Sequence, residues 1–218
     1  MRLTLITILT FGLFACTIST GKKTGENETV KDSLVSIDNS TPDNKETMTN
    51  NYSCCDFDKF VNDPRTPKLA KDIYLDNEWD LTNDEVLTYL DSLTAKDKSS
   101  RPFYFKVVTK SEKKADGYYA EGLGNAGYEY VLNNTQEFAS YFDMKQCNTE
   151  NDLTTWVDIV MLEISLIVEN ENDKTIVDNY INKIKSNCKE CSTSQKETIN
   201  KFSLILDKEW RELLKHLD

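Results

Sequence analysis

Cysteine offers the most distinctive chemistry in this 218-residue sequence. Cys188 and Cys191 have the spacing of a redox pair, but a thioredoxin-like site needs a strand leading into the motif, and here the motif lies between two predicted helices. Five cysteines follow Cys16, and we expect structural disulfides among them, with redox chemistry and a four-thiolate zinc site as alternatives. The candidates are Cys54, Cys55, Cys147, Cys188 and Cys191, of which the zinc site would use all but Cys147. The spacing does not fix the pairing, and the odd number leaves one thiol free.

A glycine-rich segment matches the letters of a nucleotide-binding motif. Residues 122–127 read Gly-Leu-Gly-Asn-Ala-Gly, as in the dinucleotide fingerprint G-x-G-x-x-G. The fingerprint needs an apolar strand ahead of it, whereas a polar stretch, residues 113–117, precedes it here. We therefore predict a glycine-relaxed loop or helix junction and no cofactor. Tyrosine beside glycine is common in binding patches, so a contact surface for a ligand or partner is predicted from Tyr118, Tyr119, Tyr128 and Tyr130.

One carboxylate falls inside an apolar helical stripe. At about 100° per residue, Glu163 lies between Trp156 and Ile159, so we expect it to be buried. An ionised carboxylate is costly to bury alone, so Glu163 should pair with Arg101 or Arg211, or else have a raised pKa and act as a general acid. We prefer the structural ion pair, because no second carboxylate lies at a spacing that would suit a glycosidase.

The only histidine, His216, lies two residues from the C-terminus. Every Ser-His-Asp or Cys-His mechanism and every multi-histidine metal site would depend on it. At the end of a helix it is expected to interact with the negative end of the helix dipole instead. We therefore predict neither a catalytic residue nor a metal site.

Apolar residues at helical spacing must position these side chains. Residues 153–168 have two apolar stripes, which predicts a central helix. Residues 102–109 alternate well enough to form a strand, so an α+β fold with a small strand element is the alternative. The preferred fold class is mainly α, a compact bundle of about six to eight helices around the central helix.

Shorter signals mark where other helices begin. Capping boxes, in which a hydroxyl and a carboxylate satisfy the first free amides of a helix, occur at Thr82-x-x-Glu85 and Ser194-x-x-Glu197. Each precedes an apolar stripe, and Ile176 begins a further stripe. Pro67 suits the first turn of a helix, because it lacks only an amide that would be unpaired there.

The N-terminus resembles the signal peptide and lipobox of bacterial lipoproteins. Arg2 precedes an apolar run, Leu3–Ala15, that is shorter than the roughly 20 residues needed to cross a bilayer. The run ends in Leu13-Phe14-Ala15-Cys16. The resemblance implies cleavage before Cys16 and anchoring by lipid on that residue in an oxidising envelope compartment. Thr17 in place of aspartate resembles the Gram-negative pattern for the outer membrane.

Composition divides the rest of the chain into a tether and one domain. Residues 1–15 are the predicted signal peptide, and residues 16–51 are the lipidated cysteine and a polar tether expected to be disordered. Residues 52–218 form a single predicted helical ectodomain. The formal net charge of −11 repels nucleic acid phosphates and anionic lipid headgroups.

These observations favour a non-enzymatic binding module at the cell envelope. Its partner would be an unknown protein or small-molecule ligand, and toxin neutralisation is one form of such binding, because an acidic domain can hold a basic toxin electrostatically. A carboxylate-dependent envelope hydrolase is the alternative, and a thiol-disulfide oxidoreductase is the third class.

Overall fold

The computed structural model describes residues 57–80, 84–171 and 175–217, which all belong to the second of two units of the chain, residues 49–218. These ranges contain helices and turns but no strand. The helices are α1 (Asp58–Val61), α2 (Lys68–Tyr74), η1 (Asp84–Leu87), η2 (Leu90–Thr94), α3 (Arg101–Ser111), η3 (Glu112–Lys114), α4 (Gly117–Asn133), α5 (Thr135–Asp143), α6 (Glu150–Glu171), α7 (Ile176–Asn187) and α8 (Thr193–Leu217), where η denotes a 3-10 helix. The mainly α fold is confirmed, and the strand alternative is wrong because residues 102–109 lie inside α3.

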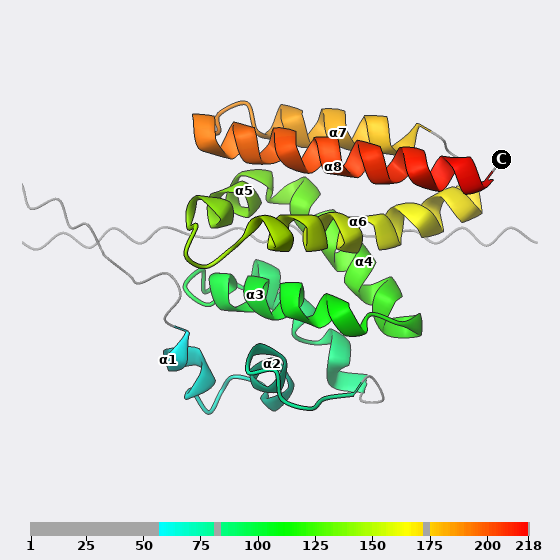
Figure 1. The fold of residues 1–218 in the computed structure, drawn as a ribbon. Coiled ribbons are helices and arrows are strands. Elements are labelled where there is room, and N and C mark those ends of the chain that lie inside the picture. Colours follow the sequence, from blue (N-terminus) through cyan, green and yellow to red (C-terminus); the bar gives the residue numbers. More distant parts are fainter. Residues whose placement is uncertain (1–56, 81–83, 172–174, 218) are drawn as a thin grey trace, which may run out of the picture. The chain divides into compact units, whose positions relative to one another are not determined.

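The predicted central helix is α6, which contacts α3, α4, α7 and α8. Figure 1 shows α7 and α8 side by side on one side of α6, with α3 on the opposite side. Trp156 and Ile159, one from each apolar stripe of α6, are therefore fully buried, whereas Leu162 and Leu166 of the second stripe are half-buried. The Trp156 ring stacks on Phe105 of α3 with 4.5 Å between ring centroids, and its indole nitrogen donates a 2.8 Å hydrogen bond to the Thr109 hydroxyl.

Reciprocal capping pairs begin the two longest helices. At α6 the Asp152 amide donates to the Thr149 hydroxyl (3.2 Å), and the Thr149 amide donates to the Asp152 carboxylate (2.6 Å). At α8 the Gln195 amide donates to the Ser192 hydroxyl (3.2 Å), and the Ser192 amide donates to the Gln195 side chain (3.0 Å). The capping box predicted at Ser194 is therefore wrong, because α8 already begins at Thr193.

The segment before α3 differs from the helix predicted there. Thr82 lies outside the described residues, and residues 84–94 form the two short helices η1 and η2 instead of one α-helix. Leu90 and Leu93 of η2 are buried, and η2 contacts α3 and α4. Pro67 immediately precedes α2 as its N-cap, one position ahead of the first turn.

Candidate binding groove

The glycines of residues 122–127 lie inside α4, where Gly124 and Gly127 allow a close approach to α6. A Cβ atom on Gly124 would lie 2.8 Å from the backbone nitrogen of Glu163 and 2.8 Å from Cβ of Leu162. A Cβ atom on Gly127 would overlap the Ile159 side chain. The predicted loop or helix junction is therefore wrong, because helix packing rather than a turn requires these glycines.

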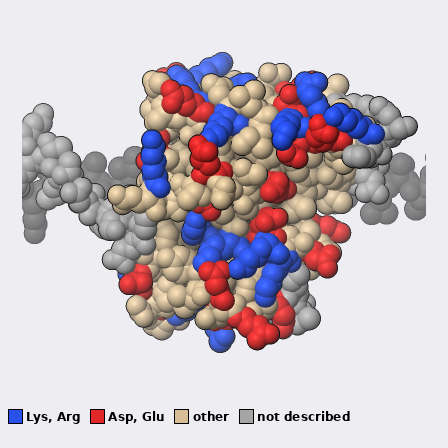
Figure 2. Space-filling view, in the orientation of Figure 1, with Lys and Arg blue, Asp and Glu red and all other residues tan. Residues whose placement is uncertain are grey.

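Beside this contact, α4 and α6 border a shallow groove of about 450 Å³, which we call the acidic groove. Its half-buried apolar side chains come mainly from α6, and its two acidic residues are Glu121 on α4 and Asp158 on α6. The lining residues are Gly117, Ala120, Glu121, Asp158, Met161, Leu162, Ser165 and Leu166. Figure 2 shows acidic side chains in the middle of the face that is turned to the viewer in Figure 1.

Carboxylates from three elements repel one another around Asp158. Desolvation raises the pKa of Asp158, and the negative charge of Glu209 on α8 raises it further. Desolvation likewise raises the pKa of the half-buried Glu112 in η3, with a further contribution from Asp158. A raised carboxyl pKa means that the fold disfavours the ionised form, so a positively charged group placed here would relieve the repulsion.

Only one of the four tyrosines predicted as a contact surface is exposed. Tyr118, next to Gly117 of the acidic groove, is 66% exposed. Tyr119 and Tyr130 are buried core residues, and the Tyr119 hydroxyl bonds with Tyr89 and donates a 2.5 Å hydrogen bond to Ser111. Tyr128 is half-buried, with its ring centroid 4.4 Å from that of Tyr180. The tyrosines therefore do not form one contact surface, because the helical period turns two of them into the core.

Glu163 is half-buried and lacks both predicted arginine partners. Arg101 bonds with Glu137 and Arg211 bonds with Asp207, so the expected ion pairs are wrong. Desolvation raises the pKa of Glu163, with a further contribution from Glu129. Glu163 does not line the acidic groove.

The sequence analysis missed Glu137 of α5, whose carboxylate accepts hydrogen bonds from three different residues. It accepts hydrogen bonds from Arg101 at 2.7 Å, from Tyr141 at 2.8 Å and from Tyr130 at 3.3 Å, which ties together α3, α4 and α5. The Arg101 side chain is only 11% exposed, and it also donates to the carbonyl oxygen of Ala95. The spacing of four between Glu137 and Tyr141 was the available local signal. With these donors in place, the Glu137 carboxylate has a structural role, because it links α3, α4 and α5.

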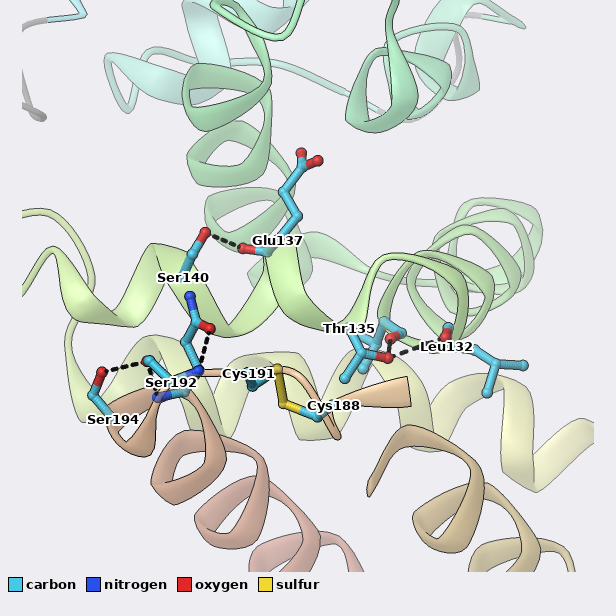
Figure 3. Close-up of a disulfide and its surroundings, with 10 residues drawn as sticks. Leu132, Thr135, Glu137, Ser140, Cys188, Cys191, Ser192 and Ser194 are labelled. Atoms are coloured by element: carbon cyan, nitrogen blue, oxygen red, sulfur yellow. Dashed lines mark hydrogen bonds between the residues drawn. A yellow bond between two sulfur atoms is a disulfide. The ribbon is translucent and has the colours of Figure 1, made fainter. Parts of the chain in front are cut away.

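Cys188 and Cys191 form a disulfide at the turn between α7 and α8, as the structural interpretation predicted. Figure 3 shows this bond close to Leu132 and Thr135 on the neighbouring helices. The two cysteines are only 2% and 6% exposed, whereas a redox site would present an exposed sulfur at a helix start. Cys147 is also disulfide-bonded, and Cys54 and Cys55 lie outside the described residues.

The remaining candidates add no further chemistry to the described part of the chain. In it, no group of three or more histidine, cysteine or carboxylate side chains is placed to hold a metal ion. His216 belongs to α8, but its side chain is outside the described part. None of the described helices combines the length and the apolar character that crossing a bilayer requires.

The acidic groove is therefore the strongest candidate site. It was not visible in the sequence because it depends on the packing of α4 against α6, which lie far apart along the chain. Comparison of this chain with family models, with curated proteins and with solved structures finds no match.

Proposed function

We propose that this chain is a lipid-anchored lipoprotein of the bacterial cell envelope whose helical domain binds a basic partner protein at the acidic groove. The observation that carries the proposal is that Asp158, which lines the groove together with Glu121, is repelled by Glu209 and repels Glu112, so that a cationic partner would relieve this repulsion. An arginine or lysine of the partner entering the groove would meet Asp158 and Glu121 together.

Two further features of the surface support binding to a protein. Interfaces combine an apolar centre with a polar rim and are enriched in tyrosine. Half-buried Met161 and Leu162 line the acidic groove together with its two carboxylates, and the exposed Tyr118 follows Gly117 of the lining. Charge complementarity would mainly accelerate association and select for basic partners. Neutralisation of a basic toxin domain is one form that this function would take.

Photo-cross-linking in cells tests the partner directly. A photoreactive residue at Tyr118 should cross-link to a protein with a basic surface, whereas one at Leu75, which is 49% exposed, should not give this product. The product should disappear in Asp158→Lys and persist in Asp91→Lys, which changes the net charge equally at an exposed position of η2. Identical products from both sites, or equal effects of the two charge reversals, would refute the proposed interface.

The anchor is tested separately by cell fractionation. The wild-type chain should sediment with the outer membrane, and Cys16→Ser should be released from it, because no acyl chain can then be attached. A Cys16→Ser protein that stays in the outer membrane fraction would contradict lipid anchoring while leaving the binding proposal intact.

Hydrolysis is the second candidate, because two carboxylates, Glu121 and Asp158, line one groove and the pKa of Asp158 is raised. The purified protein would then release reducing ends from peptidoglycan, and both Asp158→Asn and Glu121→Gln would abolish the release. Absence of any release by the wild-type protein would exclude this substrate.

A further inference from the structure

A second groove, at the turn between α7 and α8, has the opposite charge. It has a volume of about 380 Å³ and is lined by Lys185, Cys188, Lys189, Lys196, Ile199 and Asn200, so no carboxylate is among its lining residues. We call it the lysine groove. The chain as a whole has 37 acidic and 26 basic residues, so a groove lined by three lysines and no carboxylate departs from its average charge.

The three lysines have no ion-pair partner in the described residues, although all three are exposed. Other lysines do find carboxylates. Lys106, for example, lies 2.9 Å from Asp152. In a protein with excess acidic residues, a group of unpaired lysines leaves a positive potential that an anion can neutralise.

Helix stabilisation explains only part of this arrangement. Lys185 near the end of α7 and Lys189 just after it complement the negative end of that helix dipole. Lys196 lies near the start of α8, where a cation is unfavourable, and the first turn of α8 has no acidic residue. Lys196 therefore adds its charge to the positive end of a helix dipole, and both favour an anion.

The geometry of the groove is also held in place. The Cys188–Cys191 disulfide joins the end of α7 to the start of α8, so it limits how far Lys185 and Lys196 can move apart. Cys188 and Ile199 are buried and form an apolar wall, which strengthens the electric field that a bound anion would experience.

We propose that the lysine groove binds a phosphate group. The phosphate would accept hydrogen bonds from the three ammonium groups and from the Asn200 side-chain amide, and it would come either from a phospholipid headgroup or from a soluble phosphate compound. This site is independent of the acidic groove, because the two share no lining residue.

Binding is measured on the full chain carrying Cys16→Ser, so that no acyl chain contributes. The soluble probe is inorganic pyrophosphate, followed by calorimetry at low salt, and the membrane probe is a phosphatidylglycerol vesicle compared with a phosphatidylcholine vesicle by co-sedimentation. The groove variant changes Lys185, Lys189 and Lys196 to Gln. The control variant changes Lys96, Lys98 and Lys145 to Gln, which removes the same charge at exposed positions outside the groove.

We expect the groove variant to weaken binding at least tenfold and the control variant to weaken it less than twofold, with unchanged circular dichroism and melting temperature for both. If the groove variant loses only vesicle binding, the ligand is a lipid headgroup. If it loses only pyrophosphate binding, the ligand is a soluble phosphate compound. Either result supports the site. The proposal is overturned if the wild-type protein binds neither probe, or if the two variants weaken binding equally.

Discussion

Replacing Gly124 by alanine should destabilise the protein, although the same change usually stabilises a helix. Glycine inside a helix costs about 1 kcal/mol relative to alanine, so helix propensity alone predicts a gain of that size. In α4 the added Cβ would lie 2.8 Å from the backbone nitrogen of Glu163 and from Cβ of Leu162. Neither atom can rotate away, so α4 and α6 must move apart along their contact.

The expected size follows from these two opposing effects. Overpacking a core costs about 1–3 kcal/mol, and the upper half of that range applies because both opposing atoms are fixed to the α6 backbone. Subtracting the propensity gain of about 1 kcal/mol leaves a net loss of about 1–2 kcal/mol in the free energy of unfolding. For a domain of this size that loss lowers the melting temperature by roughly 2–8 °C.

Chemical denaturation and thermal melting of three variants measure the effect. Asn125→Ala is the matched control, because Asn125 is exposed on the same helix and alanine there should be neutral or slightly stabilising. Gly122→Ala should fall between the two, because its Cβ would meet only the end of the Leu87 side chain, which can move. A Gly124→Ala protein as stable as Asn125→Ala would refute the close contact of α4 and α6.

Three further changes test the charges and the disulfide. Burial raises the pKa of Asp152, but hydrogen bonds from Lys106 and Thr149 outweigh this effect and hold the pKa below its usual range. Asp152→Ala should therefore lower the free energy of unfolding by about 1–2 kcal/mol at pH 7. In urea titrations this difference from wild type should shrink as the pH falls below about 4 and through the lowered pKa, because Asp152 is then protonated in the folded protein. Asp158→Asn should instead stabilise the fold at pH 7 by a few tenths of a kcal/mol, because the raised pKa marks a disfavoured charge, and this gain should vanish once acid protonates Asp158 in both states. Changing Cys188 and Cys191 to serine should lower the free energy of unfolding by about 2 kcal/mol or less, because the loop that the disulfide closes is short. An unchanged denaturation midpoint would show that this disulfide does not contribute to stability.

Apolar stripes predicted the long helix α6 and its core residues well, whereas shorter signals for caps and loops failed at Ser194 and at residues 122–127. Pairings between distant segments could not be predicted. The burial of Trp156 follows from the stripes of α6, and the Cys188–Cys191 bond confirms the structural interpretation of that pair, although spacing alone left the pairing open. Arg101 was expected to pair with Glu163 but pairs with Glu137, 36 residues away, because the approach of α3 to α5 decides the partner. Local spacing does not determine which helices meet.

The acidic groove also depends on packing between distant segments. Substitution of a glycine at the contact of α4 with α6 therefore tests whether the partner binds in the groove. Glu121 and Asp158 are 37 positions apart and line one groove because α4 and α6 touch along backbone at Gly124. A side chain at this position would move the helices apart and with them the two carboxylates. Gly124→Ala should therefore also weaken the cross-link formed from Tyr118, whereas Asn125→Ala should leave it unchanged. Destabilisation without any loss of the cross-link would show that the partner binds outside the groove.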